Sequence, residues 1–311
     1  MNTPETTTSQ YFYPKGNPCA RLFALWYFTF LITVWTVLGH TVLGFEQSHM
    51  QPVVGVLTAC VVQWLLEWVD ARSTGRTPRY AGGFWNLANF LLPAWIPGLA
   101  VGMLIYPNEN LWPIAFAAGL SIASKVIVRA PVGPLGDATQ HVFNPSNFGI
   151  TATLVLFPWI GLAPPYHFTE NVTGIWDWVI PGFVLATGVY LHAVHTKRLP
   201  LCLAWIGGFL AQAAIRCTLF DIPWQVPLVP MTSAAFILFT LYMIPDPATT
   251  PLNPWRQVWF GLAVASIYGF LQVSHIVFGL FIALFVVCAL RGIGLYLMSL
   301  VAKRRPALEP A

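Results

Sequence analysis

The sequence carries very little charge. Asp, Glu, Lys and Arg together make up 8% of its 311 residues, whereas an ordinary soluble domain has roughly 25%. Hydrophobic residues make up 57%, so most of the surface must face something other than water. This composition argues against a soluble domain and predicts a chain whose main partner is the lipid bilayer. The net charge of +4 is then explained by membrane topology, and no nucleic-acid partner is predicted.

Cysteine is scarce and dispersed. The five cysteines form no CxxC or CxH cluster, so the sequence encodes no iron–sulfur site, structural zinc site or disulfide framework. The first twenty residues lack the basic start and apolar core of a secretory signal. We therefore expect a cytoplasmic tail over residues 1–20, a single transmembrane domain over 21–300 and a basic cytoplasmic tail over 301–311.

Long apolar runs are abundant. A spanning helix needs about 20 mostly apolar residues, and ten segments meet or approach that length. They lie near residues 21–44, 52–69, 86–106, 111–128, 146–163, 176–195, 200–219, 226–244, 256–273 and 276–299. The predicted fold is therefore all-α, a polytopic membrane protein with about ten transmembrane helices.

The basic residues support this count and give an orientation. With ten spans, one side of the membrane holds Lys15, Arg21, Arg72, Arg76, Arg79, Lys125, Arg129, Lys197, Arg198, Arg256, Arg291, Lys303, Arg304 and Arg305. On the other side Arg216 is the only exception. Because Lys and Arg collect in cytoplasmic loops, we expect a multi-pass protein of the inner (plasma) membrane with both termini in the cytoplasm.

The first candidate site surrounds the start of the fifth span. Its residues are Lys125, Arg129, His141, Asn144, Ser146 and Asn147. Pro145 forces a turn there, and the polar side chains beside it can cap the free amides of the following helix. A helix N-terminus carries partial positive charge, so with the basic residues it would form a cytoplasm-facing anion site. A well-capped helix with ordinary basic flanks would contain the same residues, and the sequence leaves both interpretations open.

The second candidate is the turn after the eighth span. Pro245 and Pro247 flank Asp246, the only acid in its loop, and would hold its carboxylate rigidly, as a ligand-holding turn requires. Thr249 and Thr250 would shape the same turn. Asp and Thr are also common helix caps, so a purely structural role is the alternative.

Polar side chains within the spans suggest a different function. Gln63, Asn89, Gln212 and Gln272 lie in apolar segments, where polar groups are costly, and could form the midplane site of a transporter or exporter for a small hydrophobic molecule. No pair of residues resembles an acid–base or nucleophilic constellation, so no catalytic residue is predicted. An assembly scaffold without a ligand is the third alternative.

The two turns together resemble the paired signatures of a membrane flavoprotein superfamily. This superfamily contains the D subunit of Rnf electron-transport complexes and the B subunit of sodium-pumping NADH:quinone reductase. The matching stretches here are Ser124-Lys125, His141-Val142-Phe143-Asn144-Pro145 and residues 242–251. A closer resemblance, to the UnbU family of enediyne biosynthesis clusters, runs through residues 38–47, 144–151, 163–171 and 277–281. It covers nearly the whole chain from about Cys19 to Gly292.

The resemblance implies a fold, a cofactor and a role. The fold would consist of two related five-helix halves, and the role would be flavin-mediated electron transfer with a partner protein, as a redox subunit and not a self-contained enzyme. The Rnf and quinone-reductase relatives attach FMN covalently to the Thr of a Ser-x-Ala-Thr motif in the loop after the fifth span. Thr169 and Thr173 are in no such motif, so a non-covalent flavin, FMN or riboflavin, is expected.

Reporter fusions test the predicted orientation. Fusions within residues 72–79 and at 197–198 should both report the cytoplasm, because both loops carry clustered basic residues. A fusion beside Glu109 should report the opposite side. If the two basic loops lie on opposite sides, the ten-span topology is wrong.

Overall fold

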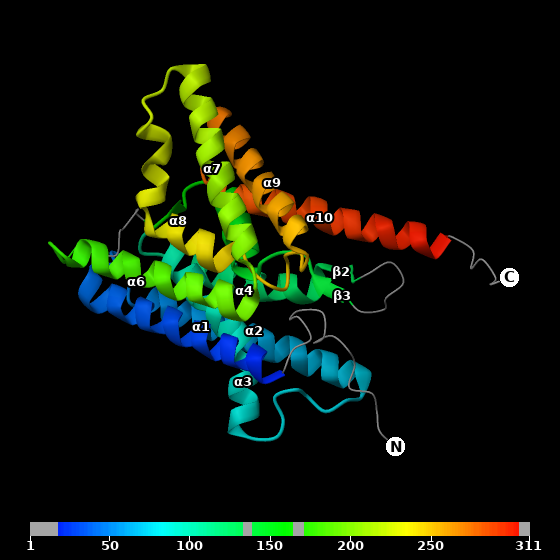
Figure 1. Ribbon diagram of the computed structural model, residues 1–311. Helices are drawn as coiled ribbons and strands as arrows, with labels where there is room; N and C mark the ends of the chain where they lie inside the picture. The colour runs from blue at the N-terminus through cyan, green and yellow to red at the C-terminus, as the bar shows by residue number, and fades with distance from the viewer. Residues whose placement is uncertain (1–17, 133–138, 164–170, 305–311) are drawn as a thin grey trace.

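The computed structural model describes residues 18–132, 139–163 and 171–304 and is built almost entirely of helices (Figure 1). Its first part contains α1 (Pro18–Leu38), the π-helical turn η1 (Gly39–Leu43), α2 (Met50–Thr74), α3 (Phe84–Leu104), α4 (Trp112–Ile127) and α5 (Pro145–Leu156). Its second part contains α6 (Trp176–Tyr190), the π-helical turn η2 (Leu191–Thr196), α7 (Leu199–Phe220), the 3-10 helix η3 (Val226–Thr232), α8 (Ala234–Leu238), the π-helical turn η4 (Phe239–Met243), α9 (Pro254–Val273) and α10 (Gly279–Arg304). Most of the two expected tails, residues 1–17 and 305–311, lies outside the described residues.

Two short antiparallel pairings fasten the loops. β1 (Ile105–Tyr106) pairs with β4 (Gly161–Leu162), and β2 (Arg129–Pro131) pairs with β3 (Thr139–His141). In the second pairing Arg129 lies opposite His141. This pairing therefore holds two residues of the first candidate site, Arg129 and His141, on one two-stranded ribbon.

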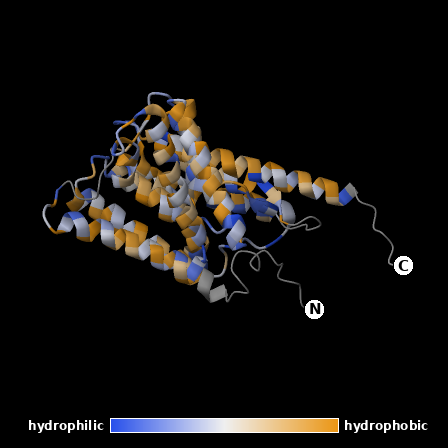
Figure 2. Ribbon diagram, turned by 45° about the horizontal axis from the view of Figure 1, so that its top comes forward, coloured by the Kyte–Doolittle hydropathy of each residue, from blue (hydrophilic) through white to orange (hydrophobic). Residues whose placement is uncertain are grey.

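Six helices in the described part of the chain are long and apolar enough to cross a membrane. The segment 226–243, two helical pieces bent by 74°, would make a seventh. Hydrophobic residues run along the long helices (Figure 2), and many of their side chains are exposed, as at Phe30 and Ile293. Exposed apolar side chains over whole helices need lipid around them. The chain is therefore a multi-pass, all-α membrane protein.

The all-α prediction is confirmed, whereas the count of ten crossings stays a prediction. Each of the ten predicted segments contains a helix. However, α4 and α5 have 16 and 12 residues, which at 1.5 Å per residue reach about 24 and 18 Å, less than a hydrocarbon core of about 30 Å. α9 has 20 residues, but Arg256, Gln257 and Gln272 reduce its apolar character.

Glycines let the helix backbones touch. A Cβ added to Gly98 in α3 would lie 2.7 Å from the carbonyl oxygen of Gly55 in α2. In the same way, a Cβ at Gly261 in α9 would lie 2.7 Å from the carbonyl oxygen of Leu201 in α7. In lipid, small residues at helix contacts take the place of a hydrophobic driving force, because close approach maximises dispersion contacts.

The two parts of the chain meet along α10. Phe285 of α10 stacks on Phe143, with ring centroids 4.7 Å apart, and Gly292 lies against the side chain of Val142. α10 therefore runs beside β3 and the start of α5, at the position of the first candidate site.

The glycine contact can be tested by adding one methyl group. Gly98→Ala should lower the free energy of unfolding by about 1–3 kcal/mol, because the new Cβ overlaps backbone that cannot rotate away. Gly207→Ala in α7 is the matched control, since a Cβ there meets nothing within 4 Å. Thermal unfolding in detergent measures both. Equal effects of the two substitutions would contradict the packing explanation.

Candidate ligand-binding site between the two turns

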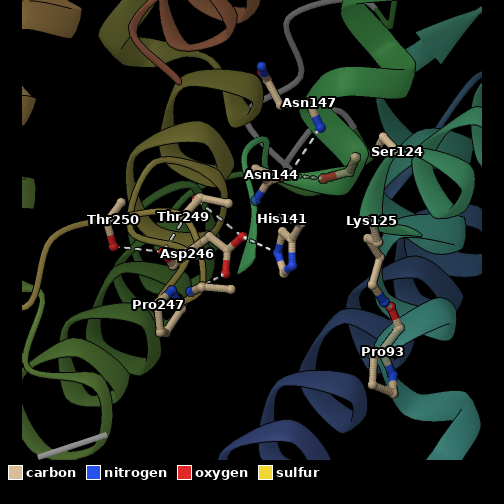
Figure 3. A network of polar contacts seen from close by, with 12 residues as sticks. Pro93, Ser124, Lys125, His141, Asn144, Asn147, Asp246, Pro247, Thr249 and Thr250 are labelled. Atoms are coloured by element: carbon tan, nitrogen blue, oxygen red, sulfur yellow. Dashed lines mark hydrogen bonds and ion pairs between the residues drawn. The ribbon is translucent and has the colours of Figure 1, made fainter. Parts of the chain in front are cut away.

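The two turns singled out by sequence lie against each other (Figure 3). Asn144 Nδ2 donates a hydrogen bond to the carbonyl oxygen of Met243 at 3.1 Å, although the two residues are 99 positions apart. His141 Nε2 lies 3.7 Å from Asp246 Oδ2 and forms an ion pair with it when the imidazole is protonated. The fold therefore joins the start of α5 to the turn after η4.

Asp246 organises its own turn. Its carboxylate accepts hydrogen bonds from the Ala248 amide at 3.0 Å and from Thr249 Oγ1 at 3.3 Å, and Thr250 Oγ1 donates to the Asp246 carbonyl oxygen at 2.7 Å. Burial raises the pKa of Asp246, but the neighbouring His141 imidazole and the hydrogen bonds from Ala248 and Thr249 outweigh it, so the pKa is lowered overall. The side chain is still 17% exposed. An ionised carboxylate thus faces the space beside His141.

The expected cap at the start of α5 is confirmed. Asn144 Oδ1 accepts from the Asn147 amide at 3.0 Å and from Ser146 Oγ at 2.8 Å. Asn147 Nδ2 in turn donates to the carbonyl oxygen of Phe281 in α10 at 3.1 Å. All three polar side chains are buried. The Asn147 amide would therefore have to leave its cap before it could bind an anion.

The two cations of the first candidate site have other partners. Lys125 Nζ donates to the Pro93 carbonyl oxygen at 3.1 Å and to Gln63 Oε1 at 3.3 Å, and in Figure 3 it extends toward Pro93. Arg129 donates to Thr139 Oγ1 at 2.7 Å and to the Lys125 carbonyl oxygen at 2.9 Å. Arg129 thus holds the β2–β3 ribbon together, while its side chain stays exposed. The contact between the turns is made by His141, Asn144 and Asp246.

Two arginines that the sequence presented only as basic flanks also belong to this region. Arg198 is 1% exposed, and its Nε donates to Thr250 Oγ1 at 2.9 Å. In the amide orientation that satisfies both groups, the Gln140 side-chain oxygen accepts from Arg291 at 3.1 Å. Arg198 follows Lys197 at the end of a span, so nothing in the sequence separates its role from that of an ordinary cytoplasmic cation.

The residues of the transporter hypothesis are distributed over both parts of the chain. Gln63 contacts Lys125, and Asn89 Oδ1 accepts from Trp26 Nε1 at 2.8 Å, all within the first part. Gln212 lies against Gly269 and Gln272 against Gly279 in the second part. Each of these side chains contacts a neighbouring helix, and the transporter hypothesis stays a prediction.

A scan against protein-family models finds no match for the chain, and a search of curated proteins finds no similar sequence. The resemblance to the Rnf and UnbU families thus stays a prediction that rests on the quoted motifs.

The Asp246 carboxylate predicts a pH-dependent stability. Asp246→Asn should lower the free energy of unfolding at neutral pH by roughly 1–3 kcal/mol, because the ionised side chain is the stronger acceptor in a buried turn. Since the folded-state pKa lies below the ordinary value of 3.8, this contribution is complete above that value and is lost as the pH falls through the folded-state pKa.

Unfolding measured between pH 3 and 7 checks this prediction. The difference in free energy of unfolding between wild type and Asp246→Asn should be constant at higher pH and should narrow only below about pH 3.8. Asp221→Asn, at an exposed left-handed position after α7, is the control and should change little. A gap that is independent of pH would show that the charge of Asp246 does not matter.

Proposed function

We propose that the chain is a membrane subunit that binds a non-covalent flavin, FMN or riboflavin, where the two turns meet, and passes electrons to or from a partner protein. The observation that supports this most is the hydrogen bond from Asn144 to Met243. It joins the two segments through which the chain resembles the Rnf-type flavoproteins. The accompanying resemblance to the UnbU family points to a role in natural-product (enediyne) biosynthesis.

The residues at the junction suit a flavin. A flavin supplies the redox chemistry, while the protein binds and orients it. The ionised, partly exposed Asp246 can accept from a ring N–H group, and His141 can donate to a ring carbonyl oxygen. The exposed residue Arg129, on the same β2–β3 ribbon as His141, already donates to Thr139 and to the Lys125 carbonyl oxygen, so it would add positive charge near a phosphate group and not a free donor. Phe143 and Phe285, already stacked, offer an apolar wall beside these polar groups.

The same proposal includes a topology of ten spans, arranged as two related five-helix halves. The chain would lie in the inner membrane with both termini in the cytoplasm. The support is a repeated detail. The first helix of each half ends in a π-helical turn, η1 after α1 and η2 after α6. In addition, both halves contain a glycine-mediated backbone contact. The short helices α4 and α5 would cross together with their adjoining loops, which are tolerated where protein surrounds them.

A flavin titration tests the function. Protein extracted in mild detergent should show the blue and near-ultraviolet flavin absorbance, and stripped protein should quench the fluorescence of added FMN or riboflavin. His141→Ala and Asp246→Asn should each weaken binding about tenfold or more, the loss expected when a buried polar contact is removed. Asp177→Asn, on an exposed part of α6, is the control.

Wild-type protein that neither retains nor binds a flavin would contradict the proposal. In that case transport assays on Gln212→Ala and Gln272→Ala become decisive, because the transporter hypothesis predicts a loss of uptake or resistance in these variants.

A further inference from the structure

Arg198 is a deeply buried cation at a backbone turn. It follows Lys197, whose backbone is left-handed with φ 54° and ends η2, and it directly precedes α7. Lys197 is exposed, whereas the Arg198 side chain is 1% exposed. Removing a guanidinium from water is costly unless its N–H groups are hydrogen-bonded. The hydrogen-bond acceptors of the guanidinium therefore indicate which part of the structure this buried cation holds in place.

The guanidinium of Arg198 bonds to the turn that carries Asp246. Nε donates to Thr250 Oγ1 at 2.9 Å, Nη2 donates to the Pro247 carbonyl oxygen at 3.3 Å, and Nη1 donates to the Thr196 carbonyl oxygen at 3.4 Å. Thr250 Oγ1 in turn donates to the Asp246 carbonyl oxygen at 2.7 Å. The planar fork of Arg198 thus spans η2 on one side and both ends of the Asp246 turn on the other.

The opposite side of the same turn faces His141 and Asn144. His141 approaches the Asp246 carboxylate, and Asn144 bonds to the Met243 carbonyl oxygen. The turn is therefore held between two sets of polar contacts. A rotation of the turn about its ends would break the contacts of Arg198 and move the carboxylate relative to His141.

We infer that Arg198 is a positioning residue of the proposed flavin site, and that it acts through Thr250 and Pro247 to hold the Asp246 carboxylate facing His141. This inference rests on the proposed function. Lys cannot replace Arg in this role, because an ammonium is a point charge and cannot bond two acceptors in the fixed geometry of the guanidinium fork.

Gln257 provides a matched comparison. It is fully buried, and its Nε2 donates to the carbonyl oxygens of Lys197 and Leu252, both at 3.1 Å. Gln257, like Arg198, therefore connects the end of η2 to the loop before α9. Its contact in that loop is Leu252, which follows the Asp246 turn, whereas Arg198 bonds to Pro247 and Thr250 within the turn. Loosening this second contact should affect stability without redirecting the carboxylate.

The experiment compares Arg198→Lys with Gln257→Met in the full-length protein. Both should lower the unfolding temperature. Only Arg198→Lys should weaken binding of FMN or riboflavin, by about tenfold, and shift the midpoint potential of the bound flavin, while Gln257→Met should stay within about twofold of wild type. Wild-type flavin affinity in Arg198→Lys would overturn the inference. Equal losses of flavin affinity in the two variants, at equal unfolding temperatures, would also overturn it and leave Arg198 a structural residue.

Amide hydrogen exchange separates this inference from the proposed function. The Ala248 and Thr249 amides, which bond to Asp246, should exchange about tenfold faster in Arg198→Lys than in Gln257→Met, whether or not a flavin binds. If no flavin binds to wild type but this difference is present, the proposed function fails and the positioning of the Asp246 turn by Arg198 holds. Equal exchange in the two variants rejects the positioning role.

Discussion

A polar group buried inside a protein has no water to bond, so every buried turn must find its hydrogen-bond partners within the protein. The turn at Asn144 and the turn at Asp246 meet this requirement by bonding to each other and to their own side chains. A turn that gave up this contact would leave a buried donor or acceptor unpaired, at a cost of about 1–3 kcal/mol for each group. Mutual satisfaction thus fixes how the two parts of the chain meet.

The remaining architecture follows from this meeting point. α10 lies beside β3 and α5, because Phe285 stacks on Phe143 and the Phe281 carbonyl oxygen accepts from Asn147. On the far side, Arg198 ties the Asp246 turn to the end of η2, and Gln257 joins the end of η2 to Leu252 in the loop that follows this turn. One short turn therefore contacts elements from both parts of the chain.

Sequence reasoning identified the helices and both turns because their signals are local. Apolar length predicts a membrane helix, and Asn before a Pro-initiated helix predicts a cap, which Asn144 forms. The reach of long side chains has no local signal. Lys125 was expected beside the ligand but extends to Pro93 and Gln63, and Arg129 was expected there too but clamps the β2–β3 ribbon.

The all-α membrane class, the places of the helices and the two unusual turns can all be read from the amino-acid sequence, since composition, apolar length and turn residues act over a few neighbouring positions. That these turns touch, and that Arg198 is buried while Lys197 is exposed, becomes visible only once the helices are packed. Contacts between residues about one hundred positions apart depend on the packing of whole helices. The sequence records that packing only diffusely, in glycines and small residues spread over many segments.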